Sequence, residues 1–143
     1  MQRKRATIFY LLLIWWIAPT IISTSANGFI SDTSKLKAIL KKAEIKLDSN
    51  KTQESLQLSK AALKFSTRNN YTYGIGKSLL LIGRIQLENG KSDSSISSLK
   101  KALSHLRSIN KELEVGVALN GIGKAFGDIG NQDSAEVYYN KAL

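Results

Sequence analysis

The chain has 143 residues, a formal net charge of +10, no cysteine, one proline and one histidine. This length suits a single domain. The missing cysteine excludes disulfides, thiolate chemistry and cysteine-based zinc sites.

The first 26 residues have the layout of a secretory signal peptide. A basic start at residues 3–5 precedes an apolar run over residues 8–18, and Pro19 and small polar residues follow. Small side chains at residues 24–26 suit a signal peptidase, so we predict cleavage after Ala26. On this interpretation the mature chain is exported to the periplasm or cell envelope of a bacterium.

An uncleaved signal anchor is the competing interpretation of the same segment. The apolar run extends over residues 6–22 when read generously, and these 17 residues are near the short limit for a spanning helix. Both interpretations keep the basic start inside the cell and export everything after residue 26.

Basic charge falls along the exported part of the chain. Residues 27–75 carry nine basic and four acidic groups, residues 76–115 seven and four, and residues 116–143 two and three. Basic domains often bind nucleic acid, but an exported one is expected to meet acidic protein segments or anionic envelope surfaces instead.

A repeat becomes visible when the chain is shifted by 40 residues. Small residues then align where two helices would approach closely, and Gly or Asn aligns where a helix would end. The aligned sets include Ala43, Gly83 and Gly123; Ser55, Ser95 and Ala135; and Asn50, Gly90 and Gly130.

Each repeat unit is predicted to form two helices. After a linker over residues 27–33, we expect an array over 34–143 with units at about 36–75, 76–115 and 116–143 (incomplete). Apolar residues spaced three and four apart mark each helix. We expect Ser92 to cap the second helix of the middle unit.

These positions resemble the tetratricopeptide repeat, a motif of alternating small and bulky apolar residues. The second unit supplies Leu79, Ile82, Gly83, Ser95, Leu99 and Ala102, and the third supplies Leu119, Ile122, Gly123, Ala135, Tyr139 and Ala142. The first unit is degenerate, with Ile39, Ala43, Ser55, Ser59 and Ala62. The resemblance implies an all-α fold of antiparallel helix pairs stacked as an α-solenoid.

The sequence departs from the family pattern in two ways. The usual period is ~34 residues, so the shift of 40 resembles a subclass with longer helices. The aromatic residue expected after the glycine is present only as Phe126, while Gln86 and Lys46 stand there in the other units. The alternative is an unrelated helical bundle with chance coincidences of Gly and Ala.

The third unit is predicted to leave an apolar face open. It stops at Leu143, within its second helix, and without a polar cap Val137, Tyr138 and Leu143 would be exposed. We therefore expect a fragment, or pairing through this end. Long-period arrays behind an export signal resemble the sensing parts of bacterial kinases and transcriptional regulators.

The string YGIGKS at residues 73–78 looks like part of a phosphate-binding loop. Such a loop requires glycine where Tyr71 stands and a strand before it, and neither is present. We expect residues 69–73 to form a turn between units, and we expect no nucleotide or other cofactor.

No pattern of catalytic or metal-ligating residues is present. His105 is the only histidine, and a zinc site needs three or four ligands. Glu112 and Glu114 are two apart, so on a helix they point away from each other. The serines suit helix caps and polar faces. We expect no metal site and no enzyme.

The resemblance implies a binding surface on the concave side, formed by the first helix of each pair. Matching the glycine places the family's ligand-contacting positions at Lys77, Leu80, Arg84 and Glu88, and at Val117, Asn120, Lys124 and Asp128. We expect Lys77, Leu80, Arg84, Asn120 and Lys124 to bind a partner protein or an acidic peptide through its carboxylates. A solvated helix face is the alternative.

The predicted function is therefore an exported protein–protein interaction module. It could be the sensing part of a larger bacterial signalling protein. The alternative is an assembly or structural adaptor that its basic first unit holds at the cell envelope.

Overall fold

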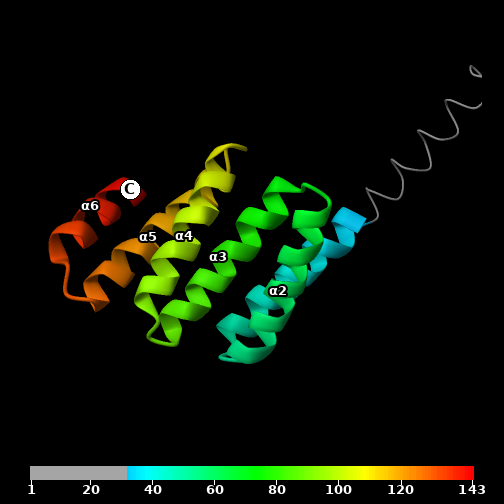
Figure 1. The fold of residues 1–143 in the computed structure, drawn as a ribbon, viewed down its shortest axis with the longest axis horizontal. Helices are drawn as coiled ribbons and strands as arrows, with labels where there is room; N and C mark the ends of the chain where they lie inside the picture. Colours follow the sequence, from blue (N-terminus) through cyan, green and yellow to red (C-terminus); the bar gives the residue numbers. More distant parts are fainter. Residues whose placement is uncertain (1–31) are drawn as a thin grey trace, which may run out of the picture. The chain divides into compact units, whose positions relative to one another are not determined.

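Helices joined by short turns make up residues 32–143, the part of the chain that our computed structural model describes. A first helix covers residues 32–48. It is followed by α2 (Thr52–Arg68), α3 (Thr72–Glu88), α4 (Ser92–Arg107), α5 (Glu112–Asp128) and α6 (Gln132–Ala142) (Figure 1). The predicted signal peptide and the alternative anchor lie outside the described residues.

The helices form three antiparallel pairs: the helix over 32–48 with α2, α3 with α4, and α5 with α6. Within residues 36–143, which form one compact unit, α3 packs on α2, α4 and α5, and α5 packs on α4 and α6. No strand occurs among residues 32–143. The predicted all-α fold of stacked helix pairs is confirmed.

All five turns between these helices have the same geometry. At each, one residue takes a left-handed backbone conformation: Asn50, Asn70, Gly90, Asn110 and Gly130, with φ between 50° and 80°. At the end of α3, the N–H of Gly90 donates to the carbonyl of Leu87, and that of Lys91 to the carbonyl of Gln86. This pair of bonds is the Schellman motif, which satisfies the last carbonyls of a helix. The sequence shift predicted the helix ends near Asn50, Gly90 and Gly130.

The helix starts differ from the prediction in detail. Ser92 is not a cap: the N-cap of α4 is Lys91, which makes no side-chain capping bond, and Ser92 is the buried first helical residue. The turn predicted over residues 69–73 is shorter, because α3 begins at Thr72. The predicted unit boundaries at residues 76 and 116 consequently lie inside α3 and α5.

Two clusters of buried apolar residues form the core. One joins the helix over 32–48 to α2 and α3 through Leu36, Leu40, Ala43, Leu47, Ala62, Leu81 and Ile85. The other joins α3, α4 and α5 through Leu80, Leu99, Ala102, Leu103, Leu106, Val115, Ala118, Leu119 and Ile122. Each cluster spans two neighbouring pairs, so burial of apolar surface holds the stack together.

Glycines let the helices approach closely within α3–α4 and α5–α6. A Cβ atom on Gly83 would lie 2.6 Å from Cγ of Leu99, and one on Gly123 would lie 2.9 Å from the ring of Tyr139. Bulky side chains of α4 and α6 therefore occupy the space that glycine leaves on α3 and α5. This explains the small-then-bulky spacing seen in the sequence.

The YGIGKS string is part of α3 and forms no phosphate-binding loop. Gly74 and Gly76 are buried helical residues. A Cβ atom on Gly76 would lie 2.8 Å from Cγ of Leu106 on α4. The two glycines serve packing between helices.

The last helix leaves part of its apolar surface exposed. Val137 is 49% exposed and Leu143 fully so. Tyr138, also expected to be open, is half-buried because its ring stacks on Phe126 at a centroid distance of 5.4 Å. In residues 32–143, no helix is both long and apolar enough to cross a membrane.

Candidate functional site

A groove lies between the first helices of the second and third pairs and holds part of the predicted site. This α3–α5 groove has a volume of about 450 Å³ and is lined by Arg84, Leu87, Glu88, Val117, Asn120, Gly121, Lys124 and Tyr139. It brings together three of the five predicted residues: Arg84, Asn120 and Lys124. Lys77 and Leu80 do not line it.

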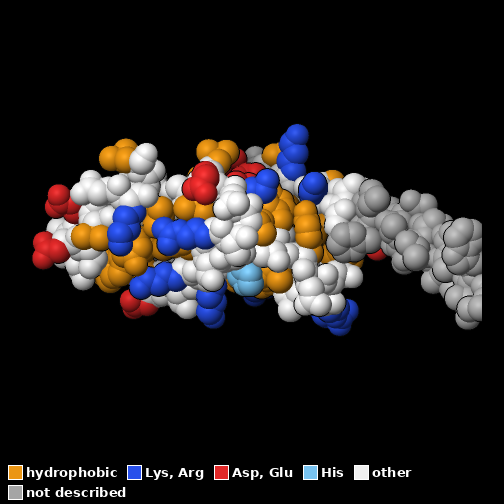
Figure 2. All heavy atoms as spheres, turned by 90° about the horizontal axis from the view of Figure 1, so that it is seen from above, with side chains coloured by type: hydrophobic (Ala, Val, Ile, Leu, Met, Phe, Trp, Pro, Cys, Tyr) orange, Lys and Arg blue, Asp and Glu red, His pale blue; other side chains and the backbone are white. Residues whose placement is uncertain are grey.

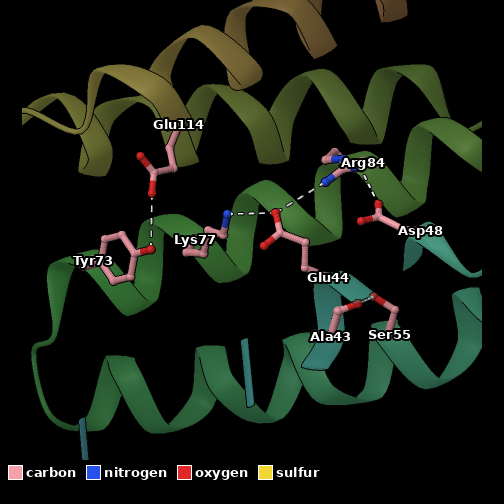
Figure 3. A network of polar contacts seen from close by, with 8 residues as sticks. All are labelled: Ala43, Glu44, Asp48, Ser55, Tyr73, Lys77, Arg84 and Glu114. Atoms are coloured by element: carbon pink, nitrogen blue, oxygen red, sulfur yellow. Dashed lines mark hydrogen bonds and ion pairs between the residues drawn. The ribbon is translucent and has the colours of Figure 1, made fainter. Parts of the chain in front are cut away.

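Lys77 is held by the first pair instead. Its Nζ donates to Oε1 of Glu44 at 3.0 Å, and its side chain is only 15% exposed (Figure 3). A charge-assisted bond at this distance stabilises the position of both groups. Lys77 therefore joins α3 to the helix over 32–48, and its ammonium group already has a carboxylate partner in Glu44.

Arg84 lies one step further along the same ionic network. Its Nη2 contacts Oδ1 of Asp48 at 3.2 Å, and its Nη1 lies 3.8 Å from Oε1 of Glu44 (Figure 3). The side chain is 30% exposed and reaches the α3–α5 groove as well. Arg84 thus connects the groove to the acidic residues of the first pair.

The sequence prediction missed these two carboxylates. Glu44 is 33 residues before Lys77, and Asp48 is 36 residues before Arg84. Such pairs have no local spacing rule, unlike pairs three or four apart on one helix. The sequence contains one indication of these ion pairs. The first helix carries acidic residues on the face that packs against α3.

Leu80 is a correction to the predicted site. It is 1% exposed and belongs to the apolar cluster with Leu99 and Leu103. Because α5 covers this side of α3, Leu80 has no surface to offer a ligand. Its role is packing.

Lys124 is the free cation of the groove. It is exposed, and among residues 32–143 it has no ion pair. Asn120, one helical turn before it on α5, is also exposed and offers both an amide donor and an acceptor. Leu87, Val117 and Tyr139 give the groove apolar walls. The arrangement suits a carboxylate next to an apolar side chain.

A second polar contact joins α3 to α5 near their first turns. The Tyr73 hydroxyl donates to Oε1 of Glu114 at 3.2 Å, and Nζ of Lys111 lies 5.6 Å from the centre of the Tyr73 ring. Burial, together with the nearby Glu114 carboxylate, raises the pKa of Tyr73 to about 12. The phenol therefore stays protonated, and remains a donor, throughout the physiological range.

Within residues 32–143, acidic and histidine side chains form no metal-binding cluster. No group of three or more His, Cys, Asp or Glu side chains there is placed to hold a metal ion. Glu114, which its spacing predicted to point away from Glu112, accepts the bond from Tyr73.

Several serines are core residues rather than the caps and polar faces predicted from the sequence. Ser55, Ser59, Ser66, Ser78 and Ser95 are all fully buried. Ser95 bonds the carbonyl of Gly83, and Ser55 that of Ala43. Their hydroxyl groups therefore lie between packed helices and are not accessible to a substrate.

Comparison with known families finds a match to the second and third helix pairs. A family model described as "Tetratricopeptide repeat" matches residues 76–104 and again residues 117–143. The first match covers most of α3 and the larger part of α4, and the second covers most of α5 and all of α6. No curated protein and no solved structure matches the chain significantly.

Proposed function

Because the chain carries tetratricopeptide repeats, which build protein–protein interaction modules, we propose that its α3–α5 groove binds an acidic peptide segment of a partner protein. Repeat proteins of this family are generally scaffolds without enzymatic activity. The two matched repeats supply α3 and α5, the helices that line the groove.

The observation that carries this proposal is the charge state of the groove. Lys124 has no carboxylate partner in the described residues, while Arg84 is shared between the groove and Asp48. A carboxylate bound between Lys124 and Asn120 would accept one bond from the charged ammonium group of Lys124 and one from the uncharged amide of Asn120, and both bonds would be charge-assisted because the acceptor is ionised. Glu88 also lines the groove, so its carboxylate favours a position for the ligand carboxylate beside α5 rather than beside α3.

The apolar residues that line the α3–α5 groove indicate what stands beside the carboxylate in the ligand. Val117 is 39% exposed and Tyr139 is 41% exposed. An extended peptide with an aliphatic side chain beside its acidic residue would cover both of them. The proposed ligand class is therefore a short segment in which acidic and aliphatic residues alternate.

Fluorescence anisotropy with two dye-labelled octapeptides tests the proposal. One alternates Glu and Leu, and the other has Gln in place of every Glu. We expect the full chain to bind the Glu peptide at least about tenfold more tightly, because charged hydrogen bonds contribute more than neutral ones. Equal affinity for the two peptides would overturn the proposal.

Substitutions locate the binding to the groove. Lys124→Gln should weaken binding of the Glu peptide by about tenfold. Lys101→Gln is the matched control, since Lys101 is an exposed lysine of α4 outside the groove. Equal losses in both variants would show that binding follows net charge alone, which would contradict the site. Lys77 is a poor probe because its substitution breaks the pair with Glu44.

Export and a signalling context are further parts of the proposed function. The basic and apolar segments of residues 1–26 support export. A sensing role in a larger signalling protein is proposed from the resemblance to long-period arrays behind export signals. A fusion of residues 1–35 to alkaline phosphatase, which is active only outside the cytoplasm, tests export; an inactive fusion would contradict it.

An envelope adaptor is the second candidate, supported by the basic character of residues 27–75. It predicts sedimentation of the full chain with anionic lipid vesicles, and loss of this binding at high salt. Binding of the same strength to neutral vesicles would contradict an electrostatic adaptor.

A further inference from the structure

Four charged side chains form a balanced cluster between the helix over 32–48 and α3 (Figure 3). Oε1 of Glu44 lies 3.0 Å from Nζ of Lys77 and 3.8 Å from Nη1 of Arg84. Oδ1 of Asp48 lies 3.2 Å from Nη2 of Arg84. Two carboxylates thus face two cations, so the cluster has no net charge at neutral pH.

Arg84 belongs both to this cluster and to the α3–α5 groove. The groove is lined by two cations, Arg84 on α3 and Lys124 on α5. Lys124 has no ion pair among residues 32–143, whereas Arg84 is held by Asp48 and Glu44. The charge of Arg84 is therefore neutralised within the cluster, and that of Lys124 is not. The space-filling view of Figure 2 likewise shows separate basic side chains with apolar surface between them.

Asp48 is the carboxylate that determines whether Arg84 can serve a ligand. Its only ion pair among residues 32–143 is with Arg84, whereas Glu44 also contacts Lys77. Removing the charge of Asp48 would leave the pair of Lys77 with Glu44 intact. The Asp48 side chain is 61% exposed, so a substitution there should not disturb the core.

The two sides of the groove consequently differ in the charge that they offer. On the α3 side, Glu88 lines the groove one helical turn after Arg84 and adds a second carboxylate to that of Asp48. On the α5 side, Asn120 and Lys124 line the groove, while the exposed Asp128 does not. Only the α5 side therefore favours an anion.

We propose, on the basis of the peptide binding proposed above, that Asp48 limits the α3–α5 groove to one ligand carboxylate. That carboxylate binds beside α5, to Lys124 and Asn120. A second carboxylate beside α3 would have to displace Asp48 from Arg84 and would also meet Glu88. The preferred partner is thus a segment in which a single acidic residue stands among aliphatic ones. Asp48 lies outside the groove and acts through Arg84.

Asp48→Asn should convert the groove into a site for two carboxylates. The variant keeps the size of the side chain and gives the cluster a net charge of one, because Glu44 alone then faces Lys77 and Arg84. Residues two apart in an extended peptide point to the same side and lie about 7 Å apart. Two carboxylates at this spacing could therefore reach the two sides of the groove.

Two dye-labelled octapeptides test this proposal by fluorescence anisotropy on the full chain. Both have Leu at every second position; one has a single Glu and three Gln, and the other has two Glu separated by one Leu. At about 0.15 M salt, which screens distant charges, wild type should bind the two peptides within about threefold of each other. Asp48→Asn should bind the peptide with two Glu at least about tenfold more tightly, because a charged hydrogen bond is gained.

Two further variants separate this effect from net charge. Asp93→Asn removes the same charge from an exposed position of α4 outside the groove and should keep the wild-type ratio of the two affinities. Combining Asp48→Asn with Arg84→Gln should return the ratio to the wild-type value, because the effect of Asp48 passes through Arg84. Circular dichroism checks that each variant keeps its helical structure.

The ratio of the two affinities decides the outcome. A tenfold ratio in wild type, an unchanged ratio in Asp48→Asn, an equal rise in Asp93→Asn, or a high ratio that persists without Arg84 would each overturn the proposal. An octapeptide with Gln in place of the single Glu tests the groove itself. If the single Glu improves binding through Lys124 but the ratio does not respond to Asp48, the limit to one carboxylate fails alone. If the single Glu gives no advantage, peptide binding and this limit fail together.

Discussion

Ser95 Oγ donates a hydrogen bond of 2.8 Å to the carbonyl oxygen of Gly83, twelve residues earlier in the chain. Ser55 makes the same bond to Ala43, at 2.7 Å and again twelve residues apart. Both serines are fully buried. The bond ties the second helix of a pair to the first, so it fixes how the two helices are set against each other.

Ser95→Ala should lower the free energy of unfolding by about 1 kcal/mol, the usual net value of a neutral hydrogen bond. The Gly83 carbonyl keeps its bond within α3, so the loss should stay in this range. Urea unfolding followed by circular dichroism measures it. Ser97→Ala, at an exposed position of the same helix, is the control; equal effects of the two substitutions would contradict a role for the buried bond.

Gly83→Ala should destabilise the fold by about 1–3 kcal/mol, because the added methyl group would overlap Leu99 in a close-packed core. Gly127→Ala is the matched comparison near the end of α5. Its Cβ would meet only Cβ of Ala135, at 4.0 Å, so the helix propensity of alanine should leave stability unchanged or raised. Thermal unfolding of both variants decides the point, and similar melting temperatures would contradict the packing argument.

Ser78→Ala should stabilise the protein by about 1 kcal/mol. The Ser78 hydroxyl is fully buried and has no hydrogen-bond partner among residues 32–143. Removing an unsatisfied polar group from a core relieves its desolvation cost. Ser104→Ala on the exposed side of α4 reports the contribution of helix propensity alone. A loss of stability in Ser78→Ala would mean that its hydroxyl has a partner.

Stability should fall between pH 10 and pH 12 through Tyr73. Its pKa is raised to about 12 in the folded chain, against about 10 for an unfolded tyrosine. The folded state therefore holds the proton more tightly, so this contribution is complete below pH 10 and is lost as the pH rises through 12.

Tyr73→Phe isolates that contribution. Burial also raises the pKa of Tyr71, so the variant should keep a shallower fall in stability over the same interval. Guanidinium unfolding midpoints at pH 9, 10 and 11 measure the slopes. Identical slopes for wild type and Tyr73→Phe would contradict the shifted pKa.

The sequence predicts the helix pairs well because local physics determines them. Glycine and asparagine at positions 50, 90 and 130 stop helices through left-handed conformations that few other residues adopt. The small residue opposite a bulky one, as in Gly83 with Leu99, is also visible in the spacing. Asn70 and Asn110 carry the same signal and end the second helices.

The site was harder to predict because it depends on how the pairs stack. Position within a repeat placed Leu80 and Lys77 on the binding face together with Arg84. Stacking instead buries Leu80 beneath α5 and brings Glu44 against Lys77. The burial of Leu80 and the ion pair of Lys77 with Glu44 both depend on residues far apart in the sequence, so the repeat pattern does not predict them. Lys124 has no ion pair in the described residues.

The most direct test of the central claim is NMR titration of the ¹⁵N-labelled full chain with the octapeptide of alternating Glu and Leu. Peptide binding in the α3–α5 groove predicts that the largest amide shifts fall on Asn120, Gly121 and Lys124, with smaller ones near Arg84. Shifts concentrated on α2 and the outer side of α4, or no shifts at saturating peptide, would contradict it.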